Sequence, residues 1–124
     1  MSIGSRSAAR APGFRIRMRV NLGGEGEVPG VINQQGPWVL HPAWRSSRDG
    51  KTLGQLRAEG HRFVISDNRR LPFQDRSIDE VITNSVPIDG MALHGPGVQS
   101  REIRRILRPG GRWVDNGAVR RVWP

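Results

Sequence analysis

Glycine residues gather directly after the first predicted strand, where a backbone turn can approach a ligand closely. The segment Asn21-Leu22-Gly23-Gly24-Glu25-Gly26 follows residues 14–22, in which apolar and polar residues alternate. Glycine has no Cβ, so the backbone of such a turn can contact a bound molecule directly. In an open parallel sheet, ligands bind outside the carboxyl ends of the strands. The glycines therefore mark either a ligand-binding turn or an ordinary turn between strands.

The residue types present exclude several kinds of chemistry. The sequence contains no cysteine, which removes disulfides, thiolate nucleophiles and thiolate metal ligands. Its three histidines, His41, His61 and His94, lack the short spacing of a metal-binding motif. We therefore expect no metal site.

The chain is strongly basic, with a formal net charge of +9, which in a nucleic-acid-binding protein reflects contacts with phosphates. All of its 20 basic residues except Lys51 are arginine. This bias also fits the codon usage of a GC-rich genome, so two interpretations stay open: a polyanion-binding surface, or a compositional bias without function. The four tryptophans, which could stack on bases, add to the first interpretation.

The hydrophobic pattern predicts an α/β fold with one core, as the length of 124 residues allows. Predicted strands cover residues 14–22, 31–33, 62–66, 78–83 and 112–115, and predicted helices cover residues 53–59 and 98–107. A further short strand is expected at residues 38–40, and Thr52 with Gln55 forms a predicted capping box. The glycines after Pro109 are expected to end the second helix. This order favours a mostly parallel sheet with helices between its strands.

Residues 1–13 are mostly serine, alanine, arginine and glycine, and we expect a flexible basic tail there, followed by a single domain at residues 14–124. No run of about 18 apolar residues is present. The N-terminus also lacks the apolar segment of a secretory signal. We therefore expect a cytoplasmic protein that has no membrane partner.

Two segments in the second half carry a resemblance to a known family. Residues 67–82 read DNRRLPFQDRSIDEVI, and residues 102–112 read EIRRILRPGGR. They resemble the pattern D-x-x-x-LPF-x-D-x-S-[FI]-D-x-V-I, followed by E-[IV]-x-R-[VI]-LRPGGR, of class I S-adenosylmethionine-dependent methyltransferases, in particular the methyltransferase type 11-like domain. The resemblance is strongest from Phe63 to Val114. It implies a compact Rossmann-like sheet and S-adenosylmethionine as the cofactor.

The segment at residues 21–35, NLGGEGEVPGVINQQ, resembles a variant of the family's first motif, LNLGxGxxxxPGxINxD, with the first helix reduced to almost nothing. Family members hold the methionine end of the cofactor against the glycine turn, which implies this role for Gly23, Gly24 and Gly26. Gln35 stands where the family usually has an acid that binds both ribose hydroxyls. An amide can still donate and accept hydrogen bonds there.

The resemblance also assigns cofactor contacts after the third and fourth predicted strands. Asp67 matches the acid that accepts a hydrogen bond from the adenine amino group, and Asn68 would offer its backbone amide to the ring. Asp67 also fits a simpler interpretation, in which it only caps a turn. Asn84 would lie beside the cofactor, where the family places substrate-facing residues.

Methyl transfer from a sulfonium requires mainly that the nucleophile, the methyl carbon and the sulfur are in line. A base is needed only where the nucleophile must first lose a proton. Asp89 and His94, in the loop after the fourth predicted strand, are the candidates, and each also fits an ordinary loop residue. The catalytic residues and the methyl acceptor stay open.

Only nine residues follow the last predicted strand, so we expect the family's C-terminal antiparallel hairpin to be missing. The last strand then has an exposed edge, unless a partner chain, a second copy or residues 117–124 cover it. Trp113 and Trp123 fit such a cover or an interface. Together with Gln35, these departures support a second hypothesis: a degenerate methyltransferase fold that acts as a non-catalytic binding module, with nucleic acid as a candidate ligand.

Overall fold

The computed structural model describes residues 17–122, so the predicted tail at residues 1–13, the start of the first predicted strand and Trp123 lie outside the described residues. The main strands are β2 (Arg19–Leu22), β3 (Ile32–Gln35), β4 (Arg62–Ile65), β5 (Ile78–Thr83), β8 (Leu107–Asp115) and β9 (Ala118–Val122). Two short strands, β6 (Met91–Ala92) and β7 (Gly95–Pro96), form a separate hairpin. The helices are the 3-10 helix η1 (Pro37–Leu40), α1 (Leu53–Ala58) and α2 (Ser100–Ile106).

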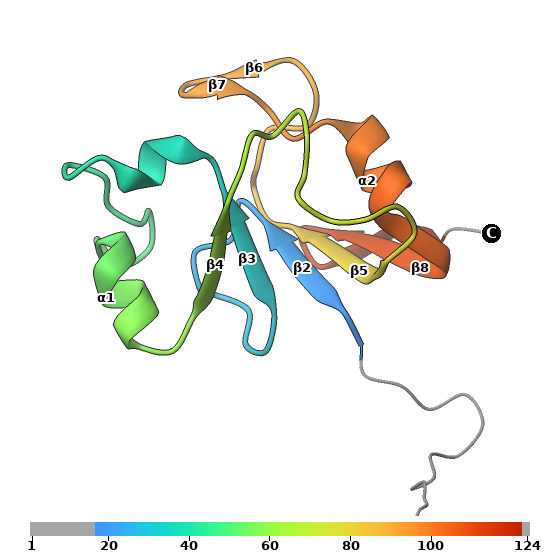
Figure 1. Ribbon diagram of the computed structural model, residues 1–124, viewed down its shortest axis with the longest axis horizontal. Helices are drawn as coiled ribbons and strands as arrows, with labels where there is room; N and C mark the ends of the chain where they lie inside the picture. The colour runs from blue at the N-terminus through green and yellow to red at the C-terminus, as the bar shows by residue number, and fades with distance from the viewer. Residues whose placement is uncertain (1–16, 123–124) are drawn as a thin grey trace, which may run out of the picture.

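The six main strands form one sheet in the order β4-β3-β2-β5-β8-β9 (Figure 1). The first five are parallel, and β9 runs antiparallel to β8. The predicted α/β fold with a mostly parallel sheet is therefore confirmed. Within the described residues, the first strand, β2, lies in the middle of the sheet; the chain then moves outward to β4 and returns to β5 on the other side of β2. Such a reversal of strand order is the switch point at which open α/β sheets bind ligands.

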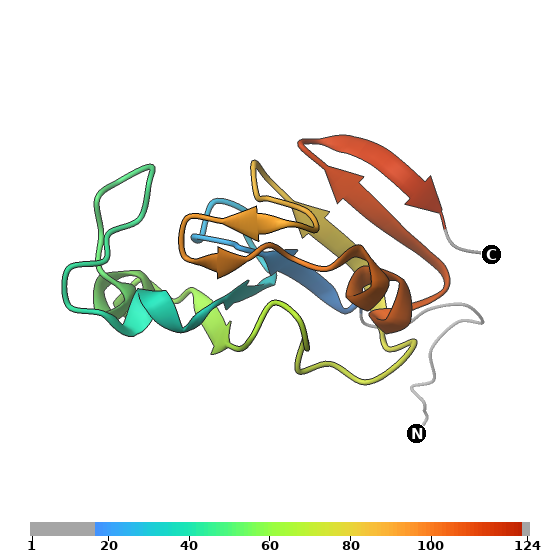
Figure 2. The ribbon, with the colours of Figure 1, turned by 90° about the horizontal axis from the view of Figure 1, so that it is seen from above.

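The helices α1 and α2 lie on opposite faces of the sheet (Figure 2). α1 connects β3 to β4 and α2 connects β5 to β8, so the two crossovers lead away from the centre of the sheet in opposite directions. Because such crossovers are right-handed in nearly all proteins, helices that lead in opposite directions cover opposite faces. No helix of the described part of the chain is long and apolar enough to span a membrane.

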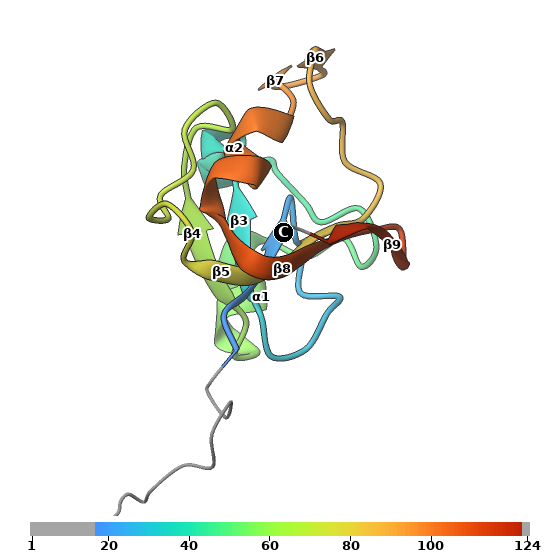
Figure 3. The same cartoon turned by 90° about the vertical axis from the view of Figure 1, so that its right-hand side faces the viewer.

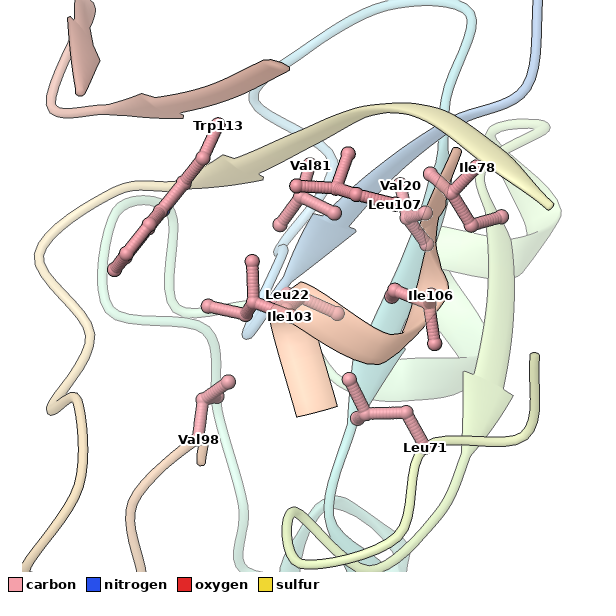
Figure 4. Packing of buried hydrophobic residues seen from close by; sticks show 10 residues of the cluster. All are labelled: Val20, Leu22, Leu71, Ile78, Val81, Val98, Ile103, Ile106, Leu107 and Trp113. Carbon is pink, nitrogen blue, oxygen red and sulfur yellow. The ribbon is translucent and has the colours of Figure 1, made fainter. Parts of the chain in front are cut away.

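The main hydrophobic core lies between α2 and the sheet (Figures 3 and 4). It contains Val20, Leu22, Leu71, Ile78, Val81, Val98, Ile103, Ile106, Leu107 and Trp113. Val20 and Leu22 alternate with Asn21 along β2, so their side chains point to the α2 face and Asn21 points to the other. Full burial of each aliphatic side chain contributes about 1.5–3 kcal/mol. The opposite face of the sheet centre is polar, since both Asn21 and its neighbour Asn33 on β3 are buried there.

The predicted capping box before α1 is confirmed. The Thr52 hydroxyl accepts a hydrogen bond from the Gln55 backbone at 3.1 Å, and the Gln55 side chain accepts one from the Thr52 backbone at 2.9 Å. The predicted strand at residues 38–40 is wrong, because this segment is η1. Pro37 opens η1 and has no N–H to give to a β-ladder, whereas the first turn of a helix tolerates it.

The predicted end of the second helix is also wrong, because α2 ends at Ile106 and Leu107 already belongs to β8. Pro109 lies within β8 rather than between a helix and a strand. The β5–β8 pairing shifts register between Leu107 and Arg112, so the Pro-Gly-Gly segment sits in an irregularity of the ladder, where a missing N–H costs little.

The expected lack of a C-terminal hairpin is wrong. Residues Asn116 and Gly117, with φ of 50° and 83°, form a two-residue turn between the paired residues Asp115 and Ala118. An Asn-Gly pair with positive φ at both positions matches the twist of a β-hairpin. Of the covers considered for β8, residues 118–122 of the chain itself are the one observed. Trp113 is buried in the core rather than at an interface.

Candidate functional site

Three adjacent cavities lie at the carboxyl ends of the central strands. The β6–β7 hairpin extends from the same edge of the sheet (Figure 1). The central cavity has a volume of about 220 Å³ and is lined by residues that follow four different strands. Gly23 comes after β2, Gln35 ends β3, Asn68 comes after β4 and Val86 comes after β5. The resemblance assigned the first three to the cofactor, and the structure brings them together around one space.

A second space, the Asp67 cavity, has a volume of about 650 Å³ and is lined by Trp38 and Leu40 of η1 and by Asp67, Asn68 and His94 among others. It shares Trp38, Asn68 and His94 with the central cavity. The rings of Trp38 and His94 stack with their centroids 5.5 Å apart and an interplanar angle of 18°, so the stacked pair borders both cavities.

The third space, the Glu27 cavity, has a volume of about 240 Å³ and is lined by Glu25, Glu27, Arg48 and Asn84 among others. It shares Gly23, Glu25 and Val86 with the central cavity. The three cavities therefore form a row along the carboxyl edge of the sheet, with the central cavity in the middle.

Of the three glycines assigned by the resemblance, only Gly23 lines these cavities. Its φ is +70°, and a Cβ would lie 2.4 Å from Cγ1 of Val86, so no other residue fits without a shift. A Cβ on Gly24 would lie 2.3 Å from Oδ1 of Asn33, inside the fold rather than toward a ligand. Gly26 packs against the ring of His61, which precedes β4. Gly24 and Gly26 therefore allow the loop to pack closely against Asn33 and His61, and neither lines one of these cavities.

Gln35 holds the glycine turn against the end of β3. Its Nε2 donates hydrogen bonds to the backbone oxygens of Gly23, at 3.0 Å, and Gly24, at 3.1 Å. The side chain is buried and lines the central cavity. Because an amide nitrogen carries two hydrogens, both of its donors are used within the protein. Gln35 therefore offers a ligand none of the hydrogen-bond donors that a ribose contact was expected to use.

Asp67 has an exposed carboxylate that pairs with Arg69, with 2.7 Å between Oδ2 and Nη2. Its Oδ1 also accepts the Arg69 backbone N–H at 2.8 Å, so Asp67 caps the turn that follows β4. The hydrogen bonds from the Arg69 side chain and backbone lower the pKa of Asp67 to about 2. The carboxylate is therefore ionised near neutral pH, and it still faces the Asp67 cavity.

Asn68 is buried and ties three segments together. Its Oδ1 accepts a hydrogen bond from Gln34 at 3.0 Å, and its Nδ2 donates one to the backbone oxygen of Pro96 at 3.0 Å. The loop after β4 is thereby fixed both to β3 and to the β6–β7 hairpin. The side chain of Asn68 supports the cavity walls, and its amide and carbonyl are used in doing so.

Glu27 is a site residue that the sequence did not indicate. Its Oε2 accepts hydrogen bonds from Asn21, at 2.7 Å, and Asn84, at 3.0 Å, and its Oε1 accepts the backbone N–H of Glu25 at 2.8 Å. Burial raises the pKa of Glu27, but the hydrogen bonds from the two asparagines and the backbone outweigh it, so the pKa is lowered. Asn84 thus reaches the predicted edge, where it orients a carboxylate.

The Glu27 cavity carries charges of both signs. The carboxylate of Glu25 accepts hydrogen bonds from the backbone and hydroxyl of Ser47, at 2.9 and 2.8 Å. Arg48 lines the same cavity and makes no ion pair with any residue that the structure describes. Two carboxylates and a guanidinium around one space can bind an ammonium group and a carboxylate of the same ligand.

The two candidate bases lie in different surroundings. His94 lines the central cavity and the Asp67 cavity. The carboxylate of Asp89 instead accepts hydrogen bonds from the backbone and hydroxyl of Ser100, both at 2.8 Å, at the start of α2. These bonds lower its pKa, and Asp89 lines none of the three cavities. Within residues 17–122, no group of three or more histidine and acidic side chains is arranged to hold a metal ion.

The fold and this edge define an α/β protein with a ligand-sized row of cavities at the switch point of its sheet. No protein-family model matches the chain, and no curated protein matches its sequence.

Proposed function

We propose that this chain binds S-adenosylmethionine along the carboxyl edge of its sheet and transfers the methyl group to an acceptor. The observation that carries the proposal is the row of three cavities at the switch point. The Asp67 cavity at one end is acidic and aromatic, and the Glu27 cavity at the other end has charges of both signs, as a zwitterion requires. S-adenosylmethionine is an elongated molecule with a base at one end and an amino acid at the other. The fold that this function implies is a compact Rossmann-like methyltransferase fold.

The Asp67 cavity suits the adenine ring. Trp38 and Leu40 offer apolar surface to its faces, and the ionised carboxylate of Asp67 can accept a hydrogen bond from the exocyclic amino group. The arrangement supports the role that the resemblance gives to Asp67. The pairing of Asp67 with Arg69 leaves the carboxylate open, since its side chain is 47% exposed.

The Glu27 cavity suits the methionine end. Glu25 and Glu27 can accept hydrogen bonds from the ammonium group, and Arg48 can pair with the carboxylate. The sulfonium and its methyl group then lie in the central cavity, beside Gly23 and Val86. The glycine at position 23 lets Val86 pack directly against the turn, and both residues border the space that the ligand would occupy.

When bound, S-adenosylmethionine supplies a methyl group that is already activated for transfer. The chain's own residues hold the two ends of the ligand and exclude water from the middle, which is mainly a proximity effect. His94 lines the central cavity, and as the base it would accept the proton that an oxygen or nitrogen acceptor loses as its bond to the methyl carbon forms. The carbon–sulfur bond would break as the new bond forms, and its electron pair would stay on sulfur.

A second candidate function is binding without catalysis. It is favoured by Gln35, whose amide donors are used to hold the glycine turn where methyltransferases use an acid for the ribose. Such a protein would bind the product S-adenosylhomocysteine as well as the methyl donor and would transfer nothing.

Thermal unfolding with S-adenosylhomocysteine tests the binding step. A ligand that binds only the native state stabilises it by about 2.7 kcal/mol at a hundred times its dissociation constant, so the Tm rises. We expect Arg48→Gln and Asp67→Ala each to weaken binding at least about tenfold, the effect of losing one charge-assisted hydrogen bond. Arg62→Gln, at the amino end of β4, is the control and should bind as the parent does.

No Tm shift at millimolar S-adenosylhomocysteine would overturn the proposal. Catalysis is tested separately with a radiolabelled methyl group: His94→Gln should keep its affinity for S-adenosylhomocysteine and lose methyl transfer to an oxygen or nitrogen acceptor. If parent and variant bind equally and neither transfers a methyl group to any acceptor tried, the non-catalytic function is favoured.

A further inference from the structure

A fourth concave region lies between the β4–β5 connection and α2 and borders the Asp67 cavity at Arg69. Its volume is about 450 Å³. Four arginines line it, Arg69 and Arg70 from the connection and Arg101 and Arg105 from α2, together with the ring of Phe73. We call it the arginine groove.

Arg105 gives the groove a fixed framework. Its guanidinium donates to both oxygens of Glu102, at 2.9 and 2.8 Å, and to Asp75 at 2.8 Å. It also donates to the backbone oxygens of Leu71, at 2.9 Å, and Phe73, at 2.8 Å. All five N–H groups are thus used, the connection is held against α2, and both carboxylates of the groove are paired.

Arg70 and Arg101 take no part in this framework. Both are exposed, and neither makes an ion pair or a side-chain hydrogen bond with another residue in the described range. Arg69 pairs only with the exposed Asp67, in an arrangement of the kind that contributes little in water. The groove therefore presents two unpaired guanidinium groups and a third that is weakly held, on a rigid base.

Phe73 adds an apolar surface between these charges. It packs partly against the main core and remains half-buried in the groove. Arginines around an aromatic ring are the combination that holds single-stranded nucleic acid, because the guanidinium groups pair with phosphates and a base lies against the ring. A duplex keeps its bases stacked inside, so it cannot use an aromatic ring within a concave groove.

We propose that the arginine groove binds single-stranded nucleic acid, with phosphates on Arg70 and Arg101 and a base against Phe73. The net charge of +9 favours the approach of such a polyanion. Arg69 lines both the groove and the Asp67 cavity, so a strand that leaves the groove on that side passes the mouth of the candidate site. Binding in the groove does not depend on methyl transfer. If the proposed function holds, the strand is the methyl acceptor.

The test is fluorescence anisotropy of the full chain with short labelled oligonucleotides, single-stranded RNA and DNA, and with the duplex of the same sequence. The groove variant is Arg70→Gln with Arg101→Gln. The control is Arg17→Gln with Arg62→Gln, which removes the same charge from exposed residues that precede β2 and open β4, at the amino edge of the sheet. A third variant, Phe73→Leu, keeps an apolar side chain and removes the ring.

For the groove variant, we expect the Kd for single strands to rise at least about tenfold at low salt, and the slope of log K against log salt to become shallower by about 1.4, since each lost phosphate contact removes about 0.7. Phe73→Leu should raise the Kd about fivefold or more. The control should change it less than about twofold, since its arginines lie outside the groove.

S-adenosylhomocysteine affinity should be unchanged in the groove variant, because neither arginine lines the three cavities; this separates failure of the groove from failure of the proposed function. Equal losses in groove and control variants would overturn the proposal, because they would reflect the net charge alone. It would also be overturned by tighter binding of the duplex, by an unchanged Kd in Phe73→Leu, or by binding to phosphatidylserine vesicles without binding to oligonucleotides.

Discussion

The sharpest test of the candidate site is to replace Gln35 with glutamate. The side chains have the same length, but the amide nitrogen that now donates to the backbone oxygens of Gly23 and Gly24 would become an oxygen. Both hydrogen bonds are lost, and a carboxylate oxygen then faces two carbonyl oxygens at about hydrogen-bond distance. The methyltransferase resemblance leads to the opposite expectation, because an acid is the family's usual residue at this position.

The magnitude follows from the contacts. Two neutral hydrogen bonds contribute about 1–3 kcal/mol together, and a buried carboxylate without a partner adds a desolvation cost, so we expect a loss of about 3–5 kcal/mol at pH 8. Burial raises the pKa of the new carboxyl in the folded state above its unfolded value. Stability relative to the parent is therefore best preserved below the unfolded pKa and falls as the pH rises through the folded pKa.

Urea denaturation at pH 5 and pH 8, followed by circular dichroism, measures this loss. Gln35→Met is the matched control: it loses the same hydrogen bonds, about 1–3 kcal/mol, without a pH-dependent difference from the parent. If Gln35→Glu is as stable as the parent at pH 8, the amide does not hold the glycine turn and the reasoning fails. If it also binds S-adenosylhomocysteine more tightly, residue 35 faces the ribose as in the family.

Three further predictions concern the fold and use the same urea titration. Glu80 is 4% exposed and accepts hydrogen bonds from Arg19 and Arg112, which are 32% and 45% exposed, so Glu80→Gln should cost about 1.5–3 kcal/mol. Burial raises the pKa of Glu80, but the two arginines outweigh it, so the pKa is lowered. The stability that ionised Glu80 contributes is therefore complete above its unfolded pKa and is lost as the pH falls through its folded pKa. This pH dependence should be absent in Glu80→Gln. Trp113→Phe removes a 2.9 Å hydrogen bond from the indole to the Thr83 hydroxyl and should cost about 0.5–1.5 kcal/mol. Thr52→Ala removes the α1 cap and should cost about 1 kcal/mol. A loss below a few tenths of a kcal/mol in any of them would contradict the contact concerned.

The parts of the fold that the sequence predicted are those with a local physical cause. The strand at residues 78–83 has the predicted bounds because all of its side chains are buried on both faces. The helix after Thr52 begins at its capping box. The C-terminal hairpin also has a local signal in the sequence, the Asn116-Gly117 pair, which is typical of a two-residue hairpin turn.

The side-chain partners at the site have no comparable signal. The sequence pattern predicted Gln35 at the carboxyl end of β3. It did not predict whether the amide faces a ligand or the neighbouring turn, because that depends on the path of the loop at residues 23–31. The path of this loop also packs Gly24 against Asn33 and places the Glu27 carboxylate within hydrogen-bond distance of Asn21 and Asn84. These contacts depend on the three-dimensional path of the loop, so periodicity and composition do not reveal them.

The lack of a helix between β2 and β3 explains why this edge is built from side chains. In a doubly wound sheet, the helix after the first strand directs free N–H groups at an anionic ligand. Here a loop takes that place, and side chains of the polar face beneath it, Asn21, Asn33, Glu27 and Gln35, hold it by hydrogen bonds, while Oδ1 of Asn21 stays without a partner among the described residues.

Because these groups are used to hold the loop, recognition of a ligand must rely on the two ends of the row of cavities, where Arg48 and Asp67 remain open. The ligand proposed above has an amino acid at one end and a planar base at the other, so its end groups are the ones that Arg48 and Asp67 could recognise.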